Sequence, residues 1–229
     1  MNTIKAFIFD RPGCGQVETV ELREPAPDEV LLKVEACGVC GTDVHIWAGT
    51  EPAAGHVILG HEFAGEIVEI GDQVTGYDIG DRVAVDPNIA CGTCPACREG
   101  RVNLCSSLKA LGVDIDGGFA EYCLVPARQL YRLDEKTTWE EAVMVEPLAC
   151  ALHGIDRAQL RAGQSVLVIG GGPIGLLMLQ LARLQGAGRL ALSEKSSWRR
   201  SLGLKYGADV LYDPANGRLA DQIPVADRP

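Results

Sequence analysis

Residues 164–188, QSVLVIGGGPIGLLMLQLARLQGAG, predict a strand, a glycine-rich turn and a helix in direct succession. The first part, QSVLVIG (164–170), is apolar almost throughout, which is typical of a strand buried in a parallel sheet. The residues after the turn predict a helix that begins at Pro173. Its apolar stripe is expected to comprise Ile174, Leu177, Leu181 and Leu184.

The turn has the spacing G-x-G-x-x-G through Gly170, Gly172 and Gly175. The motif is weak by itself, but a strand before it and a helix after it supply the context that a dinucleotide site requires. The first two glycines allow close approach of a pyrophosphate, and the third allows close packing of helix and strand. The helix start, with Pro173 and Ile174, would present free N–H groups to the phosphates. The alternative is a glycine-rich turn without a ligand.

RLALSE (189–194) predicts a second strand, and Glu194 stands at its end, 19 residues after Gly175. A carboxylate there would accept hydrogen bonds from the adenosine ribose and repel a 2′-phosphate, which favours NAD over NADP. The alternative is a solvated surface glutamate. Three nearby cations reduce this repulsion: Lys195, Arg199 and Arg200. We expect Arg199 to contact the cofactor.

The flanking segments extend the alternation of strands and helices. LACALHGIDRA (148–158) predicts a helix before the first strand, Ser196 could cap a helix that runs to Tyr206, and DVLY (209–212) predicts a third strand. Residues 148–229 thus predict part of a doubly wound parallel sheet. A complete one has about six strands, so at roughly 30 residues per unit about 90 residues would be missing.

Residues 1–147 have a different character. Short β-branched runs alternate with Gly- and Pro-rich turns, which predicts a β-barrel or a β-sandwich. The runs are IKAFIF (4–9), VETVEL (17–22), VLLKVEA (30–36), GEIVEIG (65–71), DRVAVDP (81–87) and FAEYCLVP (119–126).

A cluster of four thiols interrupts this pattern at CGTCPACREGRVNLC (91–105). Cys91, Cys94, Cys97 and Cys105 can complete a tetrahedral zinc shell that has no open position, so such a metal would be structural. The C-x2-C-x2-C run also fits iron–sulfur ligation. Redox-active cysteines or a disulfide pair are a third interpretation.

A second group of potential metal ligands precedes the cysteine cluster in the sequence. Cys40, His61 and Glu62 combine a thiolate, an imidazole and a carboxylate, and three protein ligands with one open position are typical of catalytic zinc. Asp43 could accept the second N–H of His61 and fix its tautomer. Glu146 is a further carboxylate, just before the change of pattern. Such residues alone are more often core and surface residues; the cysteine cluster and the glycine loop favour the metal site.

The composition narrows the class of protein. The 229 residues are 47% hydrophobic and carry a net charge of −10, which argues against nucleic acid as a partner. No apolar run approaches the roughly 18 residues of a membrane span, and the N-terminus lacks signal-peptide features, so a cytoplasmic location is expected. Nine cysteines in such a chain indicate metal binding or catalysis. We expect the remaining four to be small core residues and two histidines to be surface or packing residues: Cys14, Cys37, Cys123, Cys150, His56 and His153.

Taken together, the motifs resemble those of the zinc-dependent medium-chain dehydrogenases, in the branch of sorbitol (polyol) and threonine dehydrogenases. The resemblance covers nearly all of residues 1–212 and keeps the family's order. It implies a GroES-like β-barrel domain with two zinc sites (1–147), a partial Rossmann domain that binds NAD (148–229), and an active site between them. The matching motifs are GVCGTDVH, GHEFAGEIVEIG, CGTCPACREGRVNLC, GGFAEY, VEPLACALHG and GGGPIG.

The resemblance also implies roles for the upstream group. Cys40 and His61 match the ligands of the catalytic zinc, and Glu62 matches a carboxylate in or near its shell. Glu146 stands where the polyol branch has glutamate and alcohol dehydrogenases of the better-known type have cysteine. Whether Glu146 binds the metal directly or through water stays open.

The implied activity is transfer of a hydride from a polyol or another secondary alcohol to NAD(P). Thr42 and His45 match the proton-relay positions, and the full-length family forms homo-oligomers. Polyols, sugar alcohols, threonine and butanediol all remain possible substrates. Family members continue past position 229, so a fragment or a truncated product is expected. Two alternatives follow: an inactive remnant that binds zinc and nucleotide, and a metal-free quinone reductase of the same superfamily.

Overall fold

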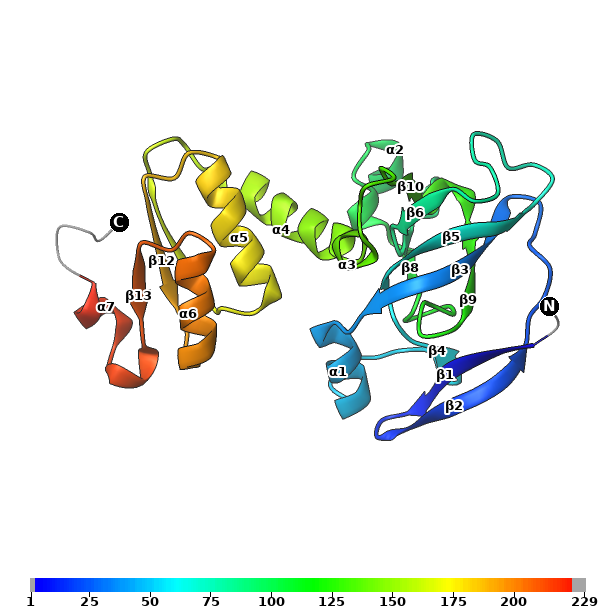
Figure 1. Cartoon of the computed structure of the whole chain (residues 1–229), viewed down its shortest axis with the longest axis horizontal. Helices are drawn as coiled ribbons and strands as arrows, with labels where there is room; N and C mark the ends of the chain where they lie inside the picture. The colour runs from blue at the N-terminus through cyan, green and yellow to red at the C-terminus, as the bar shows by residue number, and fades with distance from the viewer. Residues whose placement is uncertain (1–2, 224–229) are drawn as a thin grey trace. The chain divides into compact units, whose positions relative to one another are not determined.

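The computed structural model describes residues 3–223. The chain forms two compact units, and the boundary between them in the sequence lies between Glu146 and Pro147. Figure 1 labels most of the helices and strands of both units. No helix within residues 3–223 is both long enough and apolar enough to cross a membrane.

The first unit is mainly β-structure, as predicted. Its strands are β1 (Thr3–Arg11), β2 (Cys14–Glu21), β3 (Glu29–Gly38), β4 (Val57–Ile58), β5 (Glu62–Ile70), β6 (Arg82–Val85), β7 (Asn88–Ile89), β8 (Lys109–Ala110), β9 (Tyr122–Pro126) and β10 (Leu130–Arg132). Its helical segments are α1 (Gly41–Ala48), α2 (Pro95–Arg98), η1 (Val102–Leu104), η2 (Ala127–Gln129) and α3 (Trp139–Ala142).

The larger sheet of this unit curls into a barrel. Its strand order is β10-β6-β5-β3-β9, and the pairs are antiparallel. The two edge strands, β9 and β10, are joined by the three residues of η2 alone. Three residues span only about 10 Å, so the two edges must lie close together. The smaller sheet, β2-β1-β4, joins the barrel where the amide of Phe7 donates to the carbonyl of Phe119 at 2.8 Å.

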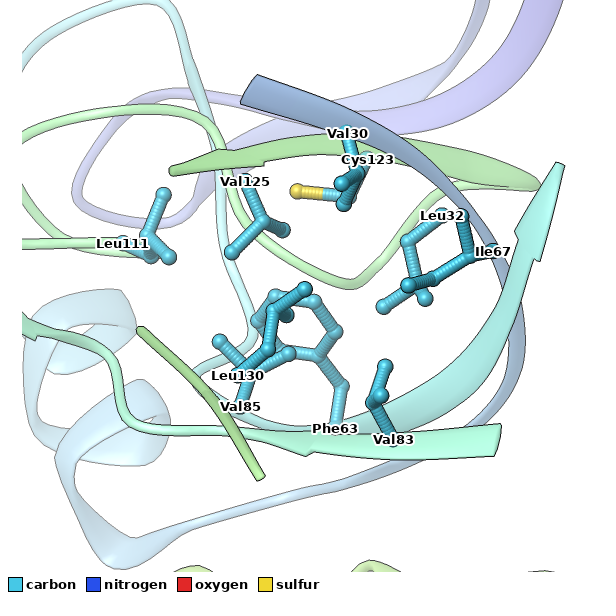
Figure 2. Close-up of a cluster of buried hydrophobic side chains, with 10 residues drawn as sticks. All are labelled: Val30, Leu32, Phe63, Ile67, Val83, Val85, Leu111, Cys123, Val125 and Leu130. Atoms are coloured by element: carbon cyan, nitrogen blue, oxygen red, sulfur yellow. The ribbon is translucent and has the colours of Figure 1, made fainter. Parts of the chain in front are cut away.

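The barrel is filled by one cluster of buried apolar side chains, which Figure 2 shows pointing toward one another. Strands β3, β6 and β9 each contribute two residues that are two apart, because alternate side chains of a strand point to the same face. Phe63 is 1% exposed. Burying each such side chain stabilises the fold by about 1.5–3 kcal/mol. The cluster comprises Val30, Leu32, Phe63, Ile67, Val83, Val85, Leu111, Cys123, Val125 and Leu130.

The second unit is a three-stranded parallel sheet with strand order β11-β12-β13. Each crossover is a helix, and consecutive right-handed crossovers in one direction place both helices on the same face of the sheet. The predicted partial doubly wound sheet is therefore confirmed. The elements are α4 (Val145–Ala158), which begins in the first unit, β11 (Ser165–Ile169), α5 (Pro173–Leu184), β12 (Arg189–Ser193), α6 (Ser197–Lys205), β13 (Val210–Tyr212), η3 (Pro214–Asn216) and α7 (Leu219–Gln222).

Helix α5 buries a different face from the predicted stripe. Leu179 and Ala182 are fully buried, whereas Leu184, which ends the predicted stripe, is 83% exposed. The reason is Gly175: a Cβ there would lie 1.9 Å from the carbonyl oxygen of Gly170, so this position must face the end of β11. Residues four and seven positions later share that face, and they are Leu179 and Ala182.

The expectation for the remaining cysteines is partly wrong. Cys123 is buried in the barrel and Cys37 packs against it, and burial raises the pKa of both thiols. Cys14 is half-buried and Cys150 is exposed. Cys150 lies off the buried face of α4, which consists of Pro147, Ala151 and Ile155.

Candidate functional site

Helix α1, which the sequence analysis did not predict, carries the first group of candidate residues. Cys40 is its N-cap, and the amide of Cys40 donates to Oδ2 of Asp43 at 2.8 Å. Asp43 and Ile46 form the buried face of the helix. Gly49 ends α1 at φ 76°, in the left-handed region that glycine adopts without strain. The helix therefore holds the thiol of Cys40 at its start and the carboxylate of Asp43 in the interior.

His61 is positioned by close backbone packing. It follows Gly60, which has φ 91° and leads from β4 toward β5. A Cβ on Gly112 or Gly117 would lie 2.4 or 2.2 Å from the carbonyl oxygen of Gly60. The amide of Gly118 donates to the same oxygen at 2.7 Å. Gly112 and the pair Gly117–Gly118, which are distant from Gly60 in the sequence, thus pack against the backbone of the residue before His61.

These elements bring together three potential ligands. Cys40, His61 and Glu62 can each offer one atom such that all three lie within 4.8 Å of one another. His61 is buried, and Cys40 and Glu62 are half-buried. A soft sulfur, an imidazole and a carboxylate fit a zinc ion, with a fourth position left for another ligand.

The surroundings of His61 support this fit. Its Nδ1 lies 3.6 Å from Oδ1 of Asp43, which is too long for a hydrogen bond. Both atoms are buried, and neither has a hydrogen-bond partner within residues 3–223. A metal bound at the other ring nitrogen would require a proton on Nδ1, and that proton would point at Asp43. The structure thus places Asp43 beside His61, as the predicted pairing needs, but the hydrogen bond itself is not formed.

The charge around His61 also favours a cation. Burial lowers the pKa of His61, but Asp43 and Cys40 raise it by more, so that it reaches about 10. The imidazole therefore lies in a negative environment. A divalent cation would occupy that environment in place of the proton, since metal ligands bind in their deprotonated forms.

The other residues predicted for this site, Thr42, His45 and Glu146, lie outside the group of three potential ligands. Thr42 Oγ1 lies 3.7 Å from the sulfur of Cys40, and His45 Nδ1 lies 3.2 Å from Oγ1 of Thr50. Thr42 and His45 are three residues apart on α1, which makes them neighbours on its surface. Glu146 is half-buried in the first turn of α4 and is outside the group of three ligands found among residues 3–223.

The four cysteines of the 91–105 segment form the second group, with all four sulfurs within 4.8 Å of one another. The sulfurs of Cys94 and Cys97 are 3.4 Å apart. Backbone amides donate to two of the sulfurs: that of Cys94 to Cys91 at 3.4 Å, and that of Cys91 to Cys105 at 3.3 Å. The short helix α2 carries Cys97, with Pro95 at its start. This closed set of four thiols fits a structural zinc ion.

The thiols of this loop differ in acidity. Hydrogen bonds from Thr93 and the amide of Cys94 lower the pKa of Cys91 to about 6. Burial, followed by the neighbouring Cys94, raises the pKa of Cys97 to about 12. Adjacent thiols resist ionising together because their negative charges repel. A cation among them would remove that penalty, which is consistent with a metal-binding loop.

The glycine loop lies in the second unit, between β11 and α5. Gly170 has φ 101°, and its amide donates to the carbonyl of Ser193 at 2.8 Å. Gly172 is the N-cap of α5, and an added Cβ there would meet nothing within 4 Å. Pro173 occupies the first turn, and Ile174 is exposed beside it. The loop therefore leaves open space at the N-terminus of α5, where backbone N–H groups favour an anion.

Glu194 is bonded to this loop, a contact that the sequence analysis missed. One carboxylate oxygen accepts from the amide of Gly171 and the other from that of Ser196, both at 2.7 Å. These hydrogen bonds lower the pKa of Glu194, and the bond from the amide of Ser196 has the larger effect. Arg200 donates to the carbonyl of Lys195 at 2.6 Å, whereas Arg199 is exposed on α6.

Comparisons with known proteins agree with this architecture. The family model for the alcohol dehydrogenase GroES-like domain matches residues 26–135. An L-threonine 3-dehydrogenase of Pyrococcus horikoshii is 42% identical over 223 residues, covering 95% of this chain and 64% of the relative. A sorbitol dehydrogenase of Halalkalibacterium halodurans is 43% identical over 186 residues, covering 80% of this chain and 54% of the relative.

A solved structure of Sinorhizobium meliloti 1021, described as a zinc-binding dehydrogenase bound to NADP, is 45% identical. Its TM-score is 0.95, and the match covers 98% of this chain and 66% of that one. The chain spans about 64% of the length of the curated relatives that it matches over 223 residues.

The fold and its two metal-seeking groups define a class: a GroES-like barrel joined to a Rossmann-type nucleotide-binding unit. The particular family follows from the relatives. The chain belongs to the zinc-dependent medium-chain dehydrogenases, in the branch that contains threonine and sorbitol dehydrogenases.

Proposed function

We propose that this chain carries the zinc centre and the nucleotide loop of an oxidoreductase that transfers a hydride from a polyol or another secondary alcohol to a nicotinamide cofactor. The observation that carries the proposal is the group formed by Cys40, His61 and Glu62, whose ligand atoms lie within 4.8 Å of one another. This group has an open position, unlike the four-thiol loop, and an open position is what a reacting alcohol needs.

When bound, zinc would supply a Lewis acid that makes the alcohol hydroxyl more acidic, and the nicotinamide would supply the hydride acceptor. Cys40, His61 and Glu62 would hold the metal. Asp43 would hold the ring of His61 in the tautomer that leaves its other nitrogen to the metal. Thr42, 3.7 Å from the sulfur of Cys40, would take the proton of the alcohol.

His45 would pass this proton to water, because it is exposed and shares a face of α1 with Thr42. The relay needs a group that can both accept and release a proton near neutral pH, and imidazole is the side chain suited to that task. Glu146 is a candidate for a further ligand, direct or through water. The four thiols of the 91–105 segment would hold a structural zinc.

We further propose that NAD is preferred over NADP. The carboxylate of Glu194 lies at the loop in its charged form, because two backbone amides lower its pKa. That charge would repel a 2′-phosphate. Arg199 is exposed near Glu194 and reduces the repulsion, so NADP should bind more weakly than NAD and still bind. The NADP-bound relative at 45% identity makes this a preference to be measured.

Metal analysis and a substrate screen test the proposal together. We expect two zinc ions per chain in the native protein and one after Cys40→Ser. We expect NADH to form with at least one member of a panel of sorbitol, L-threonine and butane-2,3-diol. Zinc in the cysteine loop alone would refute the catalytic centre, and zinc at neither site would favour the quinone reductase alternative. Two zinc ions with nucleotide binding and no turnover on a broad alcohol panel would favour the inactive remnant.

A further inference from the structure

Gly38 and Glu62 lie opposite each other at the ends of two paired strands. Gly38 is the last residue of β3 and Glu62 the first of β5, and the two are partners in the antiparallel register. Directly opposed residues point their side chains to the same face of a sheet, with Cβ atoms about 4.5–5.5 Å apart. The space above Gly38 is therefore the space that the side chain of Glu62 can enter.

The carboxylate of Glu62 occupies that space. A Cβ built on Gly38 would lie 2.5 Å from Oε2 of Glu62 and 3.3 Å from its Cβ. Real Cβ atoms do not come so close to an oxygen, so the carboxylate lies where any other residue at position 38 would place its side chain. Cys40 follows two positions later, and the carboxylate in this position is within 4.8 Å of the ligand atoms of Cys40 and His61.

We propose that Gly38 is a positioning residue of the metal centre: its missing side chain is what allows the carboxylate of Glu62 to reach a metal held by Cys40 and His61. The inference rests on the proposed function, because it requires a metal at this group. It adds a residue that has no ligand atom of its own and that acts through Glu62.

The geometry separates this role from a role in folding. Gly38 does not adopt a positive φ, so alanine fits its backbone conformation. The closest contact of a new Cβ, at 2.5 Å, is with the far end of a flexible side chain, which can rotate away, and the contact with Cβ of Glu62 at 3.3 Å requires a shift of only a few tenths of an ångström. Gly65, a glycine of β5, differs: its Cβ would lie 2.0 Å from the backbone oxygen of Lys33, which cannot move without disturbing the sheet. Gly38→Ala should therefore displace a carboxylate and leave the barrel intact.

Cadmium-113 NMR of the whole chain loaded with cadmium can test this without any measurement of activity. The four-thiol loop and the mixed group should give separate resonances, because the cadmium shift depends on the number of sulfur ligands. We expect Gly38→Ala to move the resonance of the mixed group alone, in the direction and by the amount that Glu62→Ala moves it. The double variant should show no further change. Cadmium affinity at the mixed group should fall about tenfold in each variant.

Gly41→Ala is the matched control, because Gly41 adjoins Cys40 and its added Cβ would meet nothing within 4 Å. A Gly38→Ala spectrum identical to the native one would overturn the inference, as would an unchanged spectrum for Glu62→Ala or additive shifts in the double variant. Loss of both resonances in Gly38→Ala would also count against it, since the fold would then depend on this glycine. A native protein without the mixed-group resonance would instead refute the proposed function.

Discussion

At the scale of single residues, the carboxylate of Asp43 serves two neighbours with its two oxygens. Oδ2 accepts the amide of Cys40, and Oδ1 faces Nδ1 of His61. One side chain thereby holds the start of α1, where one candidate ligand lies, and faces a second candidate ligand in the segment between β4 and β5. Asp43 is only 5% exposed. The amide of Cys40 offsets part of the cost of burying this charge, whereas Oδ1 lies 3.6 Å from Nδ1 of His61 without a hydrogen bond.

Asp43→Asn is predicted to weaken zinc binding at the mixed group by about 10- to 100-fold, the usual effect of losing an outer partner of a metal-bound histidine. The amide oxygen of asparagine can still accept the N–H of Cys40, so the helix start should remain and the free energy of unfolding should change little. Competition with a coloured zinc chelator would measure the affinity. An unchanged affinity would show that Asp43 does not support His61.

The two metal groups should respond differently to loss of a thiol. Cys97→Ser opens the closed four-thiol shell and is predicted to lower the free energy of unfolding by more than about 2 kcal/mol, as loss of a structural metal does. Cys40→Ser is predicted to change it by less than about 1 kcal/mol while removing one zinc and any turnover. Chemical denaturation of both variants, with metal analysis, would compare them. Equal losses of stability would contradict the division into a structural and a catalytic site.

Glu29 should make the first unit sensitive to acid. Both guanidinium nitrogens of Arg23 donate to its carboxylate, at 2.6 and 2.9 Å, and Arg23 is the main cause that lowers the pKa of Glu29 below 4.5. A lowered folded-state pKa adds stability above the unfolded-state value, and that stability is lost as the pH falls through the folded-state value.

Glu29→Gln is therefore predicted to lower stability by about 1 kcal/mol at pH 7 and by progressively less below about pH 4. Thermal unfolding of both proteins across this range would measure the difference. Glu51→Gln, at an exposed carboxylate, serves as the control and should show no such trend. A destabilisation of equal size at pH 7 and pH 3 would exclude ionisation of Glu29 as its source.

At the scale of elements, the turn from β11 into α5 separates two uses of glycine. An added Cβ on Gly175 would lie 1.9 Å from the carbonyl oxygen of Gly170, whereas one on Gly172 would meet nothing within 4 Å. The first glycine is needed for packing of the helix against the strand. The second leaves open space at the helix start, where a phosphate group would fit.

Gly175→Ala is accordingly predicted to destabilise the second unit by more than about 2 kcal/mol, since the strand end or the helix must move. Gly172→Ala should leave its stability within about 0.5 kcal/mol of the native value and weaken binding of ADP at least tenfold. Thermal unfolding and calorimetric titration would separate the two effects. Undiminished ADP binding by Gly172→Ala would argue against a pyrophosphate at this turn.

The strands were predictable because their patterns are local. The runs at 30–36 and 65–71 fall within β3 (Glu29–Gly38) and largely within β5 (Glu62–Ile70), since alternation and β-branching directly reflect a half-buried strand. The parallel strand at 164–170 was found from its nearly continuous apolar run, but the burial expected from that run is wrong: β11 alternates between exposed and half-buried residues, and Ile169 is 76% exposed. The buried face of α5 was not found, because it is set by the contact of Gly175 with the strand end, which no spacing of leucines reveals.

Helix α1 was missed because it is short and its pattern is weak. Its eight residues hold the two buried side chains Asp43 and Ile46, and one of them is charged. A cap by cysteine is also outside the usual set of N-cap residues. The candidate ligands themselves could be named from their chemistry and from the resemblance. Their support by Gly38 could not, because it depends on strand register.

At the scale of the whole molecule, the two kinds of candidate site belong to different units. Both metal groups lie within the unit that ends at Glu146, and the glycine loop lies in the unit that begins at Pro147. Each unit has its own buried cluster, one inside the barrel and one between the parallel sheet and its helices. A ligand that binds only the folded form of one unit should stabilise that unit by mass action.

Calorimetric unfolding of this chain is therefore predicted to resolve two transitions that respond to different ligands. Removal of metal with a strong chelator should lower the midpoint of one transition by several degrees, because binding energy of a structural metal is folding energy. ADP at about 100 times its dissociation constant should raise the other by the equivalent of about 2.7 kcal/mol. At the same ADP concentration, Gly172→Ala should reduce the second shift to the equivalent of about 1.4 kcal/mol or less, and Cys97→Ser should reproduce the first, which assigns each transition to its unit. A single transition moved by both ligands would show that the barrel and the parallel sheet unfold as one cooperative body.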